Sequence, residues 1–121
     1  MVKALLDTNI LIDFLNGVPE ARMELDLYQD KAISIITWME VMVGAAPELQ
    51  AATRSFLDGF EIVALDGPVA DQAVILRREH RIKLPDAIIW ASAQETRSLL
   101  VTRNSKDFPA TDPSVRIPYD L

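Results

Sequence analysis

The chain has 121 residues, and 50% of them are hydrophobic, which is enough to bury one core without disulfides or metal ions as staples. It contains no cysteine, which excludes disulfides, zinc–thiolate sites and thiol nucleophiles. The net charge of -6 argues against binding of nucleic acid through a broad basic surface, but it is compatible with a nuclease whose acids bind cations. We find no signal peptide and no apolar run of bilayer length, and therefore expect one cytoplasmic domain over residues 1–121.

Strand-like and helix-like patterns alternate along the chain. Short apolar and β-branched runs predict strands at residues 2–6, 32–36, 60–65 and 98–102, with a short edge strand at 115–117. The segments between them predict helices at residues 8–15, 19–28, 37–45, 48–57, 66–80 and 87–97. This alternation indicates an α/β fold of three layers, α/β/α, with a central, mainly parallel sheet of four to five strands.

Acidic side chains from four segments are predicted to meet at one edge of this sheet. Parallel strands end at the same edge, so the segments after the first, second and fourth strands share it. These segments carry Asp7, Glu40, Asn104 and Asp107. Asp86 opens a helix of about eleven residues, roughly 16 Å long, that must return the chain to the start of the fourth strand. Its first turn is therefore expected at the same edge.

Each acid also has an ordinary structural interpretation. Asp7 directly precedes a helix, where aspartate commonly caps the first turn. Thr37 and Glu40 have the spacing of a capping box. Asp86 complements the dipole of its helix, and Asp107 suits a turn. None of these interpretations explains why the acids converge.

A bound cation would explain the convergence. Two carboxylates about 4 Å apart repel by about 4 kcal/mol at an effective dielectric near 20, so a group of three or four is costly unless a cation offsets it. Oxygen donors select a hard ion, and the chain has no cysteine and one histidine far from these acids. The pattern therefore predicts a site for Mg²⁺ or Mn²⁺.

Four segments together resemble the PIN domain, and within it the VapC-type toxins of bacterial and archaeal toxin–antitoxin pairs. They are residues 5–13, 36–44, 84–93 and 100–108, which read LLDTNILID, ITWMEVMVG, LPDAIIWASA and LVTRNSKDF. By this resemblance Asp7, Glu40 and Asp86 match the family's first three acidic ligands. Many relatives have an aspartate where this chain has Asn104. Either Asn104 binds metal through its amide oxygen or through water, or Asp107 replaces the missing acid.

The resemblance implies a metal-dependent endoribonuclease, the toxin of a type II toxin–antitoxin pair, which cleaves RNA with a metal-activated water. Its catalytic residues would be Asp7, Glu40, Asp86 and Asp107, and its metal ligands would come from these and Asn104. Contacts to the RNA or its bound water would come from Thr8, Thr102 and Arg103.

The resemblance also implies protein partners. These are a small cognate antitoxin that lays a helix over the toxin, and a second copy of the chain in a homodimer or a larger toxin–antitoxin assembly. No membrane contact is expected. Apolar residues of the first two helices are candidates for the antitoxin groove, with core burial as the alternative: Phe14, Leu15, Leu27 and Tyr28.

Two other functions are left open. An aspartate-based phosphatase needs a second acid two residues after Asp7, where this chain has Asn9, and is therefore disfavoured. A PIN-like module that binds RNA or a partner without catalysis is compatible with Asn104. The basic run at residues 77–83 suits either RNA contact or a solvated helix end, and His80 within it is expected at the surface.

Overall fold

The computed structural model describes residues 2–121 and contains one five-stranded sheet. Its strands are β1 (Lys3–Leu6), β2 (Asp30–Ser34), β3 (Glu61–Val63), β4 (Leu99–Val101) and β5 (Val115–Arg116). They lie in the order β3-β2-β1-β4-β5, and all neighbouring pairs are parallel. The predicted parallel sheet is confirmed, and the short run near residue 115 forms its edge strand.

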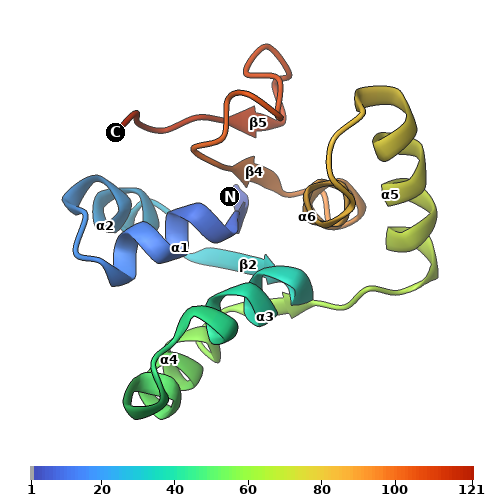
Figure 1. Ribbon diagram of the computed structural model, residues 1–121. Coiled ribbons are helices and arrows are strands. Elements are labelled where there is room, and N and C mark those ends of the chain that lie inside the picture. Colours follow the sequence, from blue (N-terminus) through green and yellow to red (C-terminus); the bar gives the residue numbers. More distant parts are fainter. Residues whose placement is uncertain (1) are drawn as a thin grey trace.

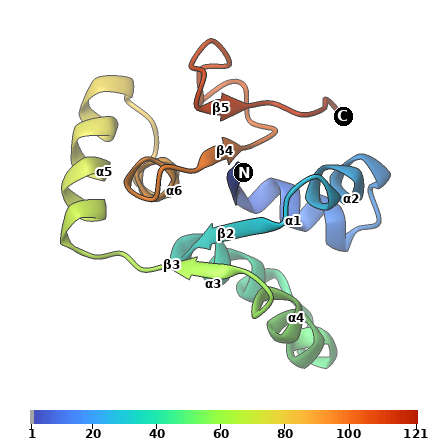
Figure 2. The same ribbon diagram turned by 180° about the vertical axis from the view of Figure 1, so that it is seen from behind.

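Helices cover both faces of the sheet. They are α1 (Thr8–Leu15), α2 (Pro19–Asp26), α3 (Ile35–Gly44), α4 (Gln50–Leu57), α5 (Gly67–His80) and α6 (Leu84–Glu95), with a 3-10 turn, η1, at Pro47–Leu49. Helices α1 to α4 lie on one side of the strands and α5 and α6 on the other (Figures 1 and 2). The predicted three-layer α/β/α fold is confirmed. Within the described residues, no helix is both long and apolar enough to cross a bilayer.

Alternate residues of the central strands build the two cores. Leu5 packs with the residues of α5 and α6, whereas Ala4 and Leu6 pack on the opposite face with residues of α1 to α4. All residues of α6 from 87 to 93 are buried, so the helix is enclosed on almost every side over this range. The largely exposed first turn of α6 follows directly from this buried part.

The second strand ends and the following helix begins two residues earlier than predicted. Ser34 caps α3, because its hydroxyl oxygen accepts a hydrogen bond from the Ile36 N–H at 3.1 Å. Thr37 lies inside the helix and is not its cap. The capping-box interpretation of Glu40 is therefore wrong, and the carboxylate of Glu40 has a different partner.

Candidate active site

Asp7 follows the last residue of β1 and is 4% exposed. Its Oδ1 accepts a hydrogen bond from the Thr8 N–H at 2.7 Å, which caps α1. Its Oδ2 accepts hydrogen bonds from the Thr102 hydroxyl at 2.7 Å and from the Asn9 amide at 3.3 Å. Asp7 therefore caps the helix and also presents a fixed, buried carboxylate at the sheet edge.

The electrostatic surroundings of Asp7 disfavour its charge. Burial raises the pKa of Asp7 from 3.8 to about 6; hydrogen bonds from Thr102 and Thr8 lower it, and the charges of Asp86 and Glu40 raise it. None of the ion pairs among residues 2–121 involves Asp7. The carboxylate is therefore desolvated without a cationic partner.

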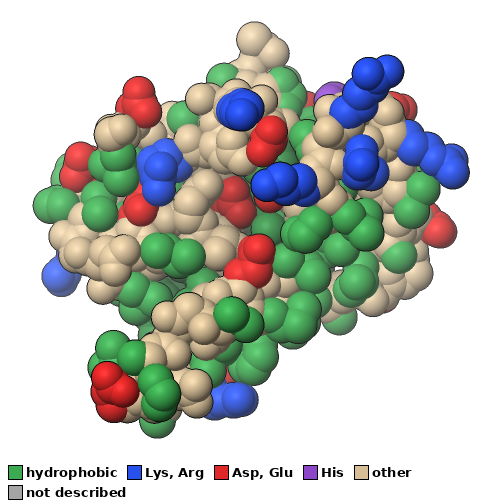
Figure 3. Space-filling view, in the orientation of Figure 1, with side chains coloured by type: hydrophobic (Ala, Val, Ile, Leu, Met, Phe, Trp, Pro, Cys, Tyr) green, Lys and Arg blue, Asp and Glu red, His purple; other side chains and the backbone are tan. Residues whose placement is uncertain are grey.

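Asp86, in the first turn of α6, is close to the other acids. Burial raises the pKa of Asp86, the charges of Asp107 and Glu40 raise it further, and the charge of Lys83 lowers it. Asp7, Glu40, Asp86 and Asp107 come from four separate segments, and their charges act on one another in pairs: Glu40 and Asp86 on Asp7, and Glu40 and Asp107 on Asp86. Acidic side chains also gather near the centre of this face, between α1, α3 and α6 (Figure 3).

Glu40 projects from α3 and is held by the start of α1. Its Oε1 accepts a hydrogen bond from the Thr8 hydroxyl at 2.7 Å, and the Thr8 oxygen lies 3.0 Å from the hydroxyl oxygen of Thr37. Thr8 therefore orients Glu40. The contact of Thr8 with substrate stays a prediction.

Asn104 and Asp107 bind each other. The Asn104 amide donates to Oδ2 of Asp107 at 2.9 Å, and the Asp107 N–H donates to Oδ1 of Asn104 at 3.2 Å. After burial, the charge of Asp107 is the largest cause that raises the pKa of Asp86. This arrangement favours Asp107 as the fourth acid and Asn104 as its support, and the role of either in metal binding stays a prediction.

Thr102 and Arg103 have internal partners. Thr102 is fully buried; its hydroxyl donates to Asp7 and accepts a hydrogen bond from the Asn104 N–H at 3.0 Å. The Arg103 guanidinium binds Asp13, with Nε 2.7 Å and Nη2 3.0 Å from the two carboxylate oxygens. The structure therefore does not favour their predicted contact with substrate, because both would first have to leave these partners.

Two residues near the site were not predicted from the sequence, Asn9 and Asp13. The Asn9 amide oxygen accepts the Arg103 N–H at 3.1 Å, while its amide nitrogen donates to Asp7. Asp13 is 6% exposed and lies on the buried side of α1, three residues after Ile10. An acid on the apolar face of a helix was the signal available in the sequence.

The donor set fits a divalent cation in its chemistry. Among residues 2–121, no three acidic or histidine side chains are gathered closely enough to form a ready-made metal site. All the converging groups are oxygen donors, which suit Mg²⁺ or Mn²⁺. Asp7 and Asp86 are both disfavoured as anions by burial and by neighbouring acids, and a cation would relieve both effects. These two residues would hold the ion.

The sequence matches the PIN domain over residues 4–112. The chain belongs to the PIN domain family. No curated protein matches it. Among solved structures, a chain of a toxin–antitoxin complex from Klebsiella pneumoniae is 50% identical, with a TM-score of 0.93, and the match covers 98% of this PIN domain chain and 100% of that chain.

More distant structures support the same assignment. A chain of DNA-bound VapBC from Salmonella typhimurium is 27% identical, with a TM-score of 0.78 and 96% of each chain covered. A chain of FitAcB from Neisseria gonorrhoeae is 26% identical, with a TM-score of 0.79, covering 98% of this chain and 99% of that one. The PIN domain described here is of the VapC type, as its motifs predict.

Proposed function

We propose that this PIN domain is a metal-dependent endoribonuclease and the toxin of a toxin–antitoxin pair. The observation that carries the proposal is Asp7, a buried carboxylate without a cationic partner on which the charges of Glu40 and Asp86 act. Family membership and the likeness to a toxin–antitoxin complex support it. Acids whose pKa values are raised by burial and by neighbouring charges are typical of functional sites.

Each side chain at the site has a distinct part in the proposed reaction. Bound Mg²⁺ would supply a Lewis acid and a water of lowered pKa for in-line attack on an RNA phosphodiester. Asp7 and Asp86 would hold the ion, and Mn²⁺ suits the same oxygens. Thr102, Asn9 and the Thr8 N–H already fix both oxygens of Asp7, so that carboxylate needs no reorganisation.

Glu40 and Asp107 complete the site. Glu40 is oriented by Thr8, and in the proposed reaction it would orient the attacking water and accept its proton. Asp107 is oriented by the Asn104 amide, so that a neutral side chain positions the fourth acid. In this arrangement Asn104 does not replace the acid that many relatives carry at its position.

We infer that an antitoxin segment docks on the apolar side of α1, α3 and α4. A groove of about 610 Å³ lies there, and its lining residues include Ile12, Leu15, Val41, Ala45 and Leu49. Its mainly apolar lining suits one face of an amphipathic helix. The 50% identical chain from a toxin–antitoxin complex supports a partner of this kind. A homodimer remains a prediction.

The four residues that we predicted for this groove have different surroundings in the structure. Leu15 lines it. Phe14 instead stacks on Phe56, with ring centroids 5.1 Å apart, and Tyr28 donates its hydroxyl to Glu24 at 2.7 Å. Leu27 is 63% exposed but lines a separate depression with Val2 and Tyr28. Phe14 is therefore partly buried against the core and does not line the groove.

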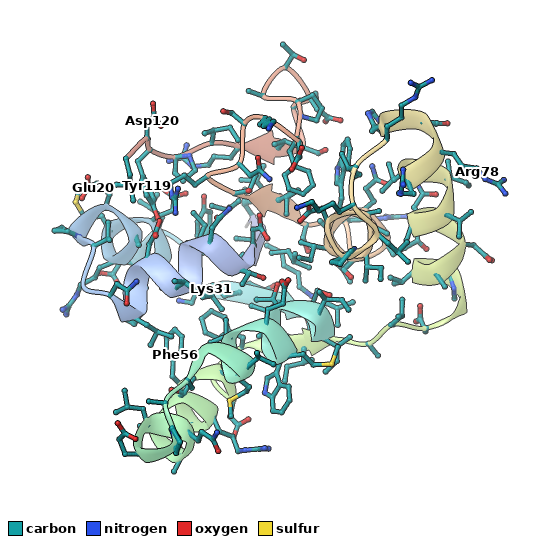
Figure 4. All side chains as sticks on the ribbon, viewed as in Figure 1. Glu20, Lys31, Phe56, Arg78, Tyr119 and Asp120 are labelled. Atoms are coloured by element: carbon teal, nitrogen blue, oxygen red, sulfur yellow. The ribbon has the colours of Figure 1, made fainter. Side chains whose placement is uncertain are left out.

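Incubation of the purified chain, free of any partner, with structured RNA and with a phosphomonoester tests the proposal. Each reaction is run with Mg²⁺ or with EDTA. We expect RNA cleavage only with Mg²⁺, and its loss in Asp7→Asn. Glu20→Gln should retain cleavage, because Glu20 is exposed in the first turn of α2, at the edge of the molecule (Figure 4). Phosphomonoester turnover without RNA cleavage would contradict the proposal, and RNA binding without cleavage would favour the inactive module.

A further inference from the structure

Asp13 joins three segments of the chain next to the site. It lies on α1, is 6% exposed, and accepts both hydrogen bonds of the Arg103 guanidinium, at 2.7 and 3.0 Å. It also accepts the Tyr119 hydroxyl at 2.8 Å. Tyr119 belongs to the segment after β5, which lies beside α1 and α2 (Figure 4). We call Asp13, Arg103 and Tyr119 the Asp13 network.

The Asp13 network is connected to Asp7 through two successive hydrogen bonds of Asn9. The backbone N–H of Arg103 donates to the Asn9 amide oxygen at 3.1 Å, and the Asn9 amide nitrogen donates to Asp7 at 3.3 Å. Thr102, the residue before Arg103, donates its hydroxyl to the same oxygen of Asp7. The anchoring of Arg103 therefore determines where both side-chain donors to Asp7 lie.

We propose that Arg103 and Tyr119 are positioning residues for the metal site. By binding Asp13 they hold residues 102–104 against α1, so that Thr102 and Asn9 keep the Asp7 carboxylate oriented toward a divalent cation. The inference rests on the proposed function, because it assumes that Asp7 binds this cation. In this proposal Arg103 does not contact RNA; it affects the metal site indirectly, by fixing the side chains that orient Asp7. Partners of this kind tune metal affinity without touching the metal.

A second network of the same chemistry provides a matched control. Glu24, on α2, is 4% exposed and binds the Arg116 guanidinium at 2.6 and 2.9 Å and the Tyr28 hydroxyl at 2.7 Å. We call these residues the Glu24 network. Among the described residues, its side chains make no hydrogen bond to Asp7, Asn9 or Thr102. The Arg116 carbonyl does accept the Thr102 N–H at 3.0 Å, but side-chain substitution keeps that backbone bond.

The experiment compares Arg103→Lys with Arg116→Lys, and Tyr119→Phe with Tyr28→Phe, in the full chain. Three quantities are measured for each: the free energy of unfolding, the affinity for Mn²⁺ from the electron paramagnetic resonance signal of the free ion, and kcat and KM for RNA cleavage. The tyrosine pair removes one hydroxyl and leaves the ring, which keeps the comparison available if an arginine variant does not fold.

Both arginine variants should lose similar stability, but only the Asp13 network should affect the metal site. We expect Arg103→Lys to lower Mn²⁺ affinity about tenfold and kcat by a similar factor, while KM for RNA changes much less. Tyr119→Phe should cause a smaller loss of the same kind. Arg116→Lys and Tyr28→Phe should leave Mn²⁺ affinity within about twofold of that of the wild type.

The outcomes separate this inference from the proposed function. Equal losses of Mn²⁺ affinity in the two networks would overturn the inference, because a general loss of stability would then be the cause. So would a rise in KM alone in Arg103→Lys, which indicates direct contact with RNA. If Arg103→Lys and Tyr119→Phe bind Mn²⁺ as tightly as the wild type does, the inference is overturned but the proposed function is not. Absence of Mn²⁺ binding in the wild type would overturn the metal-dependent function as well.

Discussion

Asp7 and Glu24 are both shielded from solvent, with Asp7 the more deeply enclosed, and their electrostatic surroundings are opposite. Each is 4% exposed, and burial is the largest influence on the pKa of both. At Glu24, hydrogen bonds from Arg116 and Tyr28 and the charge of Arg116 outweigh burial, and its pKa lies below the usual value. At Asp7 the donors are neutral and the nearby charges are negative, and its pKa rises to about 6.

This difference distinguishes a buried acid that supports the fold from one that is available for chemistry. Neutral donors such as Thr102 orient a carboxylate without neutralising its charge, whereas a guanidinium both orients and neutralises it. The charge of Glu24 is satisfied within the chain, and the charge of Asp7 is not. We therefore propose that a cation from outside the chain binds at Asp7, and expect none at Glu24, whose charge Arg116 already offsets.

The largest expected effect is on catalysis. Asp86→Asn removes a predicted metal ligand and should lower kcat for RNA cleavage by about 10³-fold. Glu24→Gln removes an acid from the Glu24 network and should leave kcat nearly unchanged at a temperature where the variant is folded. Single-turnover cleavage at saturating RNA measures both. Comparable losses of kcat in the two variants would remove the distinction between the two kinds of acid.

The pH dependence of stability should differ in sign between the two acids. The pKa of Asp7 is higher in the folded chain, so its contribution to stability is present below 3.8 and is lost as pH rises through about 6. In EDTA, wild type should therefore lose up to about 3 kcal/mol relative to Asp7→Asn between about pH 4 and about pH 7. Glu24 has a lowered pKa, so its contribution is present above 4.5 and is lost as pH falls.

Denaturant unfolding of wild type, Asp7→Asn and Glu24→Gln across this pH range checks the expectation. Taking differences between each variant and wild type removes the pH-independent cost of the altered hydrogen bonds. The two difference curves should slope in opposite directions. Two curves of the same sign would show that burial, and not the charge of the partner, decides how these acids titrate.

Removal of the Arg116 guanidinium should give Glu24 a raised pKa like that of Asp7. Arg116→Met leaves Glu24 buried without its guanidinium, which should lower the free energy of unfolding by about 2 kcal/mol at neutral pH. This is below the usual cost of breaking a buried pair, because the Arg116 side chain is 43% exposed. The pKa of Glu24, followed by NMR, should rise above its usual value. An unchanged pKa in Arg116→Met would mean that Tyr28 alone neutralises the effect of burial.

An additional acid at the site should lower metal-free stability and strengthen metal binding. Asn104→Asp places another carboxylate beside Asp107, and like charges in contact with water repel by about 1 kcal/mol. Metal-free stability should fall by about this amount, and Mg²⁺ affinity, measured by calorimetry, should rise. Gln29→Glu, on the exposed segment between α2 and β2, should leave Mg²⁺ affinity unchanged. Weaker Mg²⁺ binding in Asn104→Asp would indicate that support of Asp107 by the amide matters more than charge.

The smallest effect is expected where an acid is exposed. Lys3 on β1 and Glu61 on β3 form an ion pair across β2, and the Glu61 side chain is 56% exposed. Lys3→Met should change the free energy of unfolding by less than about 1 kcal/mol, because water already solvates the charge of Glu61. Thermal denaturation at low and high salt measures this. A loss as large as that of Arg116→Met would contradict the importance assigned to burial.

The sequence alone determined the sheet and the segments that meet at its edge. Strands alternate with helices, and parallel strands end at one edge whatever their side chains do, so Asp7, Glu40 and Asp107 were predicted to converge. Asp86 followed from the length of its helix. The start of α3 was misplaced by two residues, because Thr37 and Ser34 are both acceptable caps in sequence.

Only the tertiary structure decided which buried acids have an arginine side chain as partner. Arg103 and Asp13 are 90 positions apart, and Arg116 and Glu24 are 92 apart, so no local pattern connects them. These pairs depend on where the segments around β4 and β5 lie against α1 and α2. Asp7, Asp13 and Glu24 are similar in sequence as acids beside apolar residues. Burial opposes the charge of all three acids. Asp13 and Glu24 each have a guanidinium beside them and stabilise the fold, whereas Asp7 has none.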